Sequence, residues 1–131
     1  MNFVVEDFVT KSKISGSYDV LRNINLCPKI QHSHSLYHML FRLAHTSGII
    51  KNGSTKSTSK LAVNCDSMAI PIVPILAPFF KETLVIDKRT KDSPKYWQKL
   101  LEFKPTHYLS LFTEYNFLIS HKHCKNLFDK F

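Results

Sequence analysis

Lysine and arginine are the residues whose number and spacing point most clearly to a chemistry in this sequence, and that chemistry is phosphate binding. The chain has 18 Lys and Arg against 10 Asp and Glu, which gives a formal net charge of +8. No Asp or Glu stands between Lys29 and Lys60, and contact with nucleic-acid phosphates favours such uncompensated cations. The alternative is a solvated basic surface without a partner, since net charge alone does not prove binding.

The cations lie on segments that we expect to be extended or to form turns. Hydroxyl side chains between Gly53 and Lys60 add short hydrogen-bond donors to the middle group. The side chains expected to contact nucleic acid are Lys11, Lys13, Arg22, Lys29, His32, Lys51, Lys56, Lys60, Lys88, Arg89 and Lys91. The sequence therefore predicts nucleic acid, and RNA in particular, as the partner.

Histidine and cysteine could hold a metal ion, but their spacing argues against it. They lie in two groups, which are His32, His34 and His38 near a predicted helix start, and His121, His123 and Cys124 near the C-terminus. A structural zinc site takes four ligands at recognisable spacing, and neither group supplies them. We expect no metal and no cofactor, and we expect the three cysteines, Cys27, Cys65 and Cys124, to be reduced structural thiols.

The sequence also lacks a recognisable catalytic constellation. Its ten carboxylates are dispersed, and no close pair is spaced to hold the two metal ions of a phosphodiesterase. No motif marks Cys27 or Cys124 as a nucleophile, and three glycines leave no P-loop or dinucleotide-binding loop. The sequence predicts a protein that is not an enzyme and has no small-molecule substrate.

Length and composition favour one folded domain over residues 1–131. A hydrophobic content of 44% can build a modest core, and 131 residues are too few for a second one. No secretory signal, no Arg-rich presequence and no run of about 18 apolar residues is visible. We expect an intracellular protein that does not enter a membrane.

Periodicity and turn signals predict an α/β (α+β) fold. Apolar residues at helical spacing predict a helix over residues 36–43, and Ser93-Pro94 predicts the start of a helix that runs to Phe103. Residues 2–8 can form a short strand or a helix start, and residues 48–51 and 60–63 are expected to pair as a hairpin. A helix interrupted by prolines is expected after Asp66, and a last helix from Thr106.

The order of these features resembles a single half-domain of the LAGLIDADG homing endonuclease family. Ile14-Ser15-Gly16-Ser17-Tyr18 stands where that family ends its motif helix and begins its first strand. Lys29-Ile30-Gln31-His32-Ser33 resembles the strand end that leads into the next helix, and Pro78-Phe79-Phe80 resembles the end of the following helix. The resemblance covers nearly the whole chain. It implies a curved four-stranded antiparallel sheet with helices packed on one face.

One departure from the family bears on function. Ser15 stands where the family places the carboxylate that binds the catalytic metal, and a hydroxyl cannot supply that charge. The resemblance therefore implies a module that has kept the nucleic-acid-binding sheet and lost the nuclease activity.

These observations lead to a specific functional expectation. We expect a non-catalytic structural RNA-binding protein, namely an rRNA-binding subunit of a mitochondrial ribosome that contacts neighbouring ribosomal proteins. This implies a location in the organelle without a recognisable presequence. Two alternatives stay open: an active LAGLIDADG homing endonuclease or intron maturase that works as a dimer, and a protein–protein adaptor that uses helices between Tyr96 and Phe117.

Overall fold

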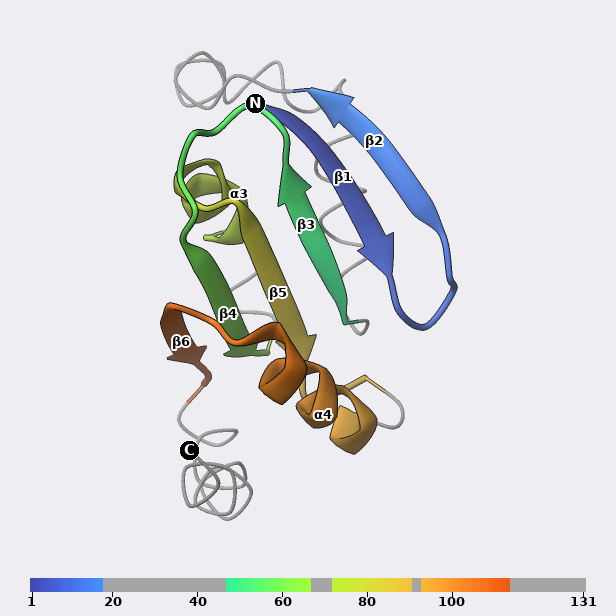
Figure 1. Ribbon diagram of the computed structural model, residues 1–131. Coiled ribbons are helices and arrows are strands. Elements are labelled where there is room, and N and C mark those ends of the chain that lie inside the picture. The colour runs from blue at the N-terminus through green and yellow to red at the C-terminus, as the bar shows by residue number, and fades with distance from the viewer. Residues whose placement is uncertain (18–46, 67–71, 91–92, 114–131) are drawn as a thin grey trace.

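A mixed six-stranded sheet forms the body of the protein (Figure 1). The computed structural model describes residues 1–17, 47–66, 72–90 and 93–113. The strands are β1 (Asn2–Asp7), β2 (Lys13–Ser17), β3 (Gly48–Asn52), β4 (Lys60–Cys65), β5 (Glu82–Asp87) and β6 (His107–Leu111). Their order across the sheet is β2-β1-β3-β5-β4-β6.

The sheet has an antiparallel half and a parallel half. β1 pairs antiparallel with β2 and β3, and β3 pairs antiparallel with β5. β4 lies between β5 and β6 and is parallel to both. Parallel neighbours need a crossover connection: α3 (Val73–Leu76) and the 3-10 helix η2 (Ala77–Phe79) precede β5, and α4 (Ser93–Phe103) precedes β6. The carboxyl ends of β4, β5 and β6 consequently meet at one end of the sheet.

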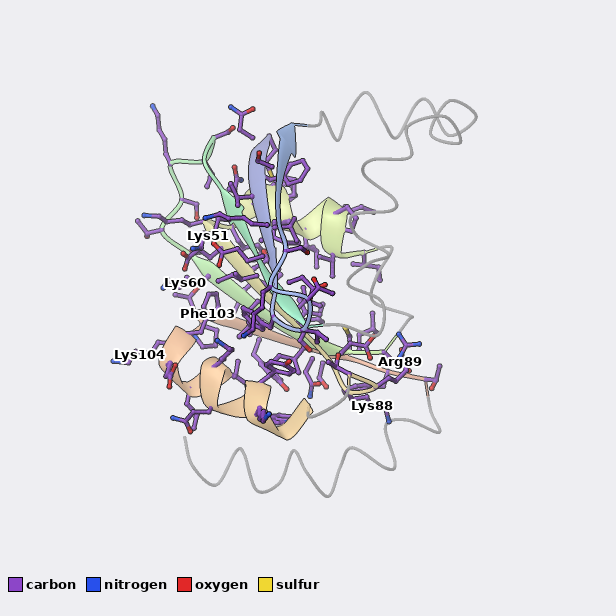
Figure 2. The ribbon with its side chains drawn as sticks, turned by 90° about the vertical axis from the view of Figure 1, so that its right-hand side faces the viewer. Lys51, Lys60, Lys88, Arg89, Phe103 and Lys104 are labelled. Atoms are coloured by element: carbon purple, nitrogen blue, oxygen red, sulfur yellow. The ribbon has the colours of Figure 1, made fainter. Side chains whose placement is uncertain are left out.

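The alternation of side chains along the strands creates two apolar cores, one on each face of the sheet. On β4, Leu61 and Val63 belong to one core, where Val73 of α3 also packs. Ala62 belongs to the other core, together with Leu100 of α4. Successive side chains of a strand face opposite sides of its sheet. The helices α3 and α4 therefore cover opposite faces, as Figure 1 and Figure 2 both show.

Several predicted elements are confirmed. The α/β class is confirmed, and α4 begins at Ser93 and ends at Phe103. Of the two alternatives for residues 2–8, the strand is the one that forms, over Asn2–Asp7. The helix expected after Asp66 is short, since α3 spans four residues and gives way to η2, and each has proline in its first turn. The helix predicted over residues 36–43 lies outside the described residues. So do residues 18–25 and 27–31, for which bounding polar residues predict extended segments.

The predicted four-stranded antiparallel sheet with helices on one face is wrong. The described sheet has six strands and includes parallel pairs, and its helices pack on both faces. The predicted hairpin is also wrong, because β5 lies between β3 and β4. Pairing between strands distant in sequence leaves no local signal. The turn residues Asn52-Gly53 therefore indicate where β3 ends, but they do not indicate which strand pairs with β3.

The helix predicted from Thr106 is wrong as well. Residues His107–Leu111 form β6, which pairs with β4 and packs Leu109 and Leu111 against the core that includes α3. A short apolar run is ambiguous between helix and strand when its partner is distant in sequence. No helix in the described part of the chain is both long and apolar enough to cross a membrane.

The segment compared with the LAGLIDADG motif has a different setting from the one expected. Residues Lys13–Ser17 form β2, which is paired with β1, the element directly before it. A strand therefore stands where the resemblance places a helix. Within the described residues the resemblance has no structural support, and the family assignment stays a prediction.

Candidate functional site

Two groups of charged side chains lie on different sides of the molecule. Figure 2 shows Lys51, Lys60 and Lys104 along one side, and Lys88 and Arg89 on the other. We define the charged face as the strand residues Glu6, Lys13, Lys51, Lys60 and Glu82. We define the carboxyl-end cluster as Cys65, Asp66, Asp87, Lys88 and Arg89, where the parallel strands β4 and β5 end.

The charged face follows from strand alternation. Val5 and Ile50 point into the core that includes α3. Their neighbours Glu6 and Lys51 therefore point to the opposite side. Glu6 Oε1 accepts a hydrogen bond from Lys51 Nζ at 3.1 Å, and Lys13 Nζ lies 3.4 Å from the same oxygen. The hydrogen bond from Lys51 is the main cause that lowers the pKa of Glu6, so this carboxylate is charged at neutral pH.

A second ion pair lies on the two strands beyond β3 on this face. Lys60 Nζ is 3.1 Å from Glu82 Oε2 and 5.0 Å from the centroid of the Phe103 ring. The side chains of Lys51 and Lys60 are 46% and 36% exposed. Exposed ion pairs contribute only about 0–1 kcal/mol. A phosphate group can therefore compete with the carboxylates for these lysines.

The remaining predicted contact residues are placed elsewhere. Lys11 is exposed in the turn between β1 and β2, and Lys56 is exposed in the loop between β3 and β4. Lys88 and Arg89 belong to the carboxyl-end cluster and are separated from Lys51 and Lys60 (Figure 2). Four predicted residues lie outside the described part of the chain, namely Arg22, Lys29, His32 and Lys91.

The loop between β3 and β4 uses its hydroxyl groups to hold its own backbone. The backbone N of Ser57 donates to Thr55 Oγ1 and that of Ser59 donates to Ser57 Oγ, each at 3.1 Å. The backbone N of Ser54 donates to Asn52 Oδ1 at 2.9 Å. A hydroxyl that accepts a bond can still donate one. The loop is thus braced internally while its hydroxyl hydrogens stay available to a ligand.

Asp87 is the centre of the carboxyl-end cluster. It ends β5 and is 0% exposed. Its Oδ1 accepts hydrogen bonds from the backbone N and the Nε of Arg89, both at 2.9 Å, while its Oδ2 accepts one from Nη2. This pairing raises the pKa of Arg89 and supplies the charged hydrogen bonds that a buried carboxylate needs.

Asp66 follows β4 and links that strand to the segment after β6. It is 1% exposed, and its Oδ2 accepts hydrogen bonds from the backbone N of Thr113 at 2.8 Å and from the Thr113 hydroxyl at 3.0 Å. The neighbouring Cys65 is a free, buried cysteine, as expected for a structural thiol. Burial, with the charges of Asp87 and Asp66, raises the pKa of the Cys65 thiol. The thiol therefore stays protonated and unreactive.

Lys88 completes the carboxyl-end cluster. Its backbone N donates to the Cys65 carbonyl at 3.1 Å, and its Nζ lies 5.7 Å from the centroid of the Phe112 ring. Burial lowers its pKa although Asp66 and Asp87 act in the opposite direction. Proteins with parallel sheets bind ligands at the carboxyl ends of their strands. This end of the sheet is therefore a second candidate site.

Sequence reasoning missed the two aspartates of this cluster. A signal existed, since Asp66 and Asp87 each end an apolar strand segment, Leu61–Cys65 and Leu84–Ile86 respectively. Recognising it required knowledge that the two strands are parallel and adjacent. Among the described residues, no group of three or more His, Cys, Asp and Glu side chains could hold a metal ion.

Comparisons with known proteins bear on the fold. No family model and no curated protein matches the chain. A structure of Bacillus cereus PatB1 with a sulfonyl adduct is similar, with a TM-score of 0.55 and 17% identity over 86% of this chain and 37% of that one. A second PatB1 structure gives a TM-score of 0.52 and 20% identity over 88% and 36% of the two chains. The chain thus spans little more than a third of PatB1, and at this identity the likeness shows the fold alone.

Proposed function

We propose that the chain binds RNA through the charged face and the loop that precedes β4. The observation that carries this proposal is the burial of the acidic side chains Asp7, Asp66 and Asp87, which are 7%, 1% and 0% exposed. The other described carboxylates, Glu6, Glu82 and Glu102, reach solvent, and so do all the described lysines. Cations therefore dominate the surface more strongly than the formal net charge of +8 suggests.

The mode of binding follows from the ion pairs of the charged face. Lys51 and Lys60 exchange a carboxylate for a phosphate group when RNA binds, and the counterions that the RNA releases favour the complex. Phosphate contacts position a protein without reading sequence. We therefore expect RNA to be recognised by its shape and backbone.

A salt titration tests the proposal. Affinity for a structured RNA, measured by fluorescence anisotropy in 50 to 300 mM KCl, is expected to fall on a log–log plot by about 0.7 to 0.9 per phosphate contacted. The double variant Lys51→Gln/Lys60→Gln should bind about threefold more weakly and with a shallower slope. Lys88→Gln is the matched control, because Lys88 lies on the other side of the molecule (Figure 2). The proposal would be overturned if the RNA affinity of wild type does not change with KCl concentration, or if the double variant binds as well as wild type.

The narrower expectation of a mitochondrial ribosomal subunit stays a prediction. It requires that the protein sediment with ribosomes from its source and that ribonuclease release it. Sedimentation apart from ribosomes would remove the ribosome from the proposal and leave RNA binding to be judged by the salt titration.

The position of the carboxyl-end cluster, together with the likeness to PatB1, motivates a second candidate function, which is covalent chemistry by a nucleophilic side chain. Asp66 directly follows β4, the middle strand of the parallel half, and Ser67 follows Asp66 in the sequence. Ser67 itself lies outside the described residues. The reason to test Ser67 is the structure of PatB1 with a sulfonyl adduct, because nucleophilic side chains form such adducts.

A labelling experiment decides this second candidate. The protein is incubated with a sulfonyl fluoride, and its intact mass is measured against that of the Ser67→Ala variant. One adduct that is present in wild type and absent in Ser67→Ala supports an activated serine. No adduct under conditions that label a serine hydrolase run in parallel removes this candidate.

A further inference from the structure

Lys104 has an unusual backbone conformation. Lys104 and Lys11 are the non-glycine residues with positive φ in the described part of the chain, at 51° and 60°, and no described glycine has a positive φ. Lys104 directly follows α4 and precedes Pro105. Glycine is the usual residue at this position, because a Cβ atom makes a left-handed backbone unfavourable. The end of α4 therefore carries a lysine where glycine would be more stable.

The surroundings of Lys104 relate it to the charged face. Figure 2 shows it beyond Phe103 on the side that carries Lys51 and Lys60. The Phe103 ring is the one that Lys60 Nζ approaches to 5.0 Å. The side chain of Lys104 is exposed. Its left-handed backbone thus places a cation next to the Lys60 end of the charged face.

The pairing of the lysines differs in a way that affects binding. Lys51 is paired with Glu6, and Lys60 with Glu82. No carboxylate among the described residues forms an ion pair with Lys104. A paired lysine must give up its carboxylate before it binds phosphate, so part of the gain is cancelled. An unpaired lysine has no such competitor.

We propose that Lys104 is the principal phosphate contact on this side of the protein, and that the end of α4 retains it there in spite of backbone strain. Strained conformations tend to persist where they serve function. Lys11 also has a positive φ and also forms no ion pair with a described carboxylate, but Lys104 lies beside the Lys60 end of the charged face. The inference deepens the RNA-binding proposal and rests on it. It adds a residue that the sequence did not single out.

Substitutions at Lys104 separate its charge from its backbone. Lys104→Gln is expected to weaken RNA binding about fivefold at 150 mM KCl and to reduce the salt slope by about 0.7 to 0.9, whereas Lys104→Arg should bind like wild type. Lys104→Gly should lose the same affinity but raise the melting temperature by about 3 °C, because glycine accepts the left-handed backbone. Lys51→Gln, which removes a paired lysine, should weaken binding less than about twofold.

Lys11→Gly is the matched backbone control. It relieves the same kind of strain in the β1–β2 turn, at the edge of the sheet opposite to β6, to which Lys104 leads. Its melting temperature should rise as in Lys104→Gly, because both substitutions relieve a left-handed backbone, and this rise is the readout that the control supplies.

The outcomes distinguish this inference from the proposal beneath it. If wild type shows no salt-dependent RNA binding, RNA binding fails and the role of Lys104 fails with it. If wild type binds as expected but Lys104→Gln loses no more affinity than Lys51→Gln, the inference about Lys104 is overturned and RNA binding stands. Normal melting of Lys104→Gln shows that any loss of affinity does not come from unfolding.

Discussion

The charged face and the carboxyl-end cluster use the same kinds of side chain in opposite ways. On the charged face, Glu6 and Lys51 meet at 3.1 Å with 31% and 46% of their side chains exposed. In the carboxyl-end cluster, the Asp87 side chain is 0% exposed and binds Arg89, which is 26% exposed. The Glu6–Lys51 pair is exposed to water, whereas the carboxylate of the Asp87–Arg89 pair is buried.

The difference teaches that burial, more than charge, decides what an ion pair does. Water screens Glu6 and Lys51, so their pairing contributes little to stability and either partner can be exchanged. Asp87 is buried away from water, and the hydrogen bonds that it accepts from Arg89 help to compensate for the lost hydration. The charged face is therefore suited to reversible binding, whereas the carboxyl-end cluster holds the ends of the parallel strands together.

The largest expected effect is the loss of the buried carboxylate. We expect Asp87→Asn to lower the free energy of unfolding by about 3 kcal/mol, because it leaves the guanidinium of Arg89 without its charged partner. Urea denaturation followed by the fluorescence of Trp97, the single tryptophan, measures this change. The matched surface variant Lys51→Gln should cost less than about 1 kcal/mol. If the two variants lose the same free energy of unfolding, the proposed difference between the buried and the exposed ion pair is wrong.

The next effect is alkaline destabilisation through Cys65. Because folding raises the pKa of its thiol, the thiolate forms in the unfolded chain at a pH where the folded chain keeps the proton. Stability from this group is complete below the unfolded pKa of about 8.5 and falls as pH rises above it, by at most about 1.4 kcal/mol per pH unit. The free energy of unfolding is measured between pH 7.5 and 9.5 in a Cys27→Ser/Cys124→Ser background.

A further variant isolates the contribution of this thiol. Adding Cys65→Ala to the same background should remove the extra alkaline loss, although it lowers stability at every pH because it leaves a small cavity. The folded background protein should also resist a thiol reagent at pH 8. Rapid labelling of one thiol per folded molecule would show that Cys65 is accessible, and that this end of the sheet is open where the structure has it closed.

How much the sequence could predict depends on how local each interaction is. The start of α4 is predicted correctly because Ser93-Pro94 is a local signal. β6 is mistaken for a helix because its partner β4 lies more than forty residues earlier in the chain. The hairpin fails for the same reason, since Asn52-Gly53 gives no information about β5.

The candidate site shows the same limit. The sequence identified Lys13, Lys51 and Lys60, but their grouping with Glu6 and Glu82 follows from strand register and could not be read from spacing. Sequence reasoning weighed the carboxylates as metal ligands and took Asp66 as the residue before a helix, without predicting that any of them is buried. Whether a carboxylate is buried depends on the strand order, which no local pattern gives.

The smallest expected effect is on the charged face itself. Pairing with Lys51 lowers the pKa of Glu6 on folding, so its contribution is present above the unfolded pKa of about 4.3 and is lost as pH falls through the folded value. After screening by water this contribution is about 0.5 kcal/mol. Glu6→Gln should therefore be less stable than wild type by that amount at pH 7 and equally stable at pH 2.

Salt and RNA sharpen this last comparison. In 0.5 M KCl the difference between Glu6→Gln and wild type at pH 7 should shrink, because salt screens exposed charges. The same substitution frees Lys13 and Lys51 from their shared carboxylate, and RNA affinity should rise about twofold. A stability difference that persists at pH 2 and in high salt would mean that Glu6 acts through packing. The charged face would then resemble the carboxyl-end cluster, and the exchange of carboxylate for phosphate would lose its physical basis.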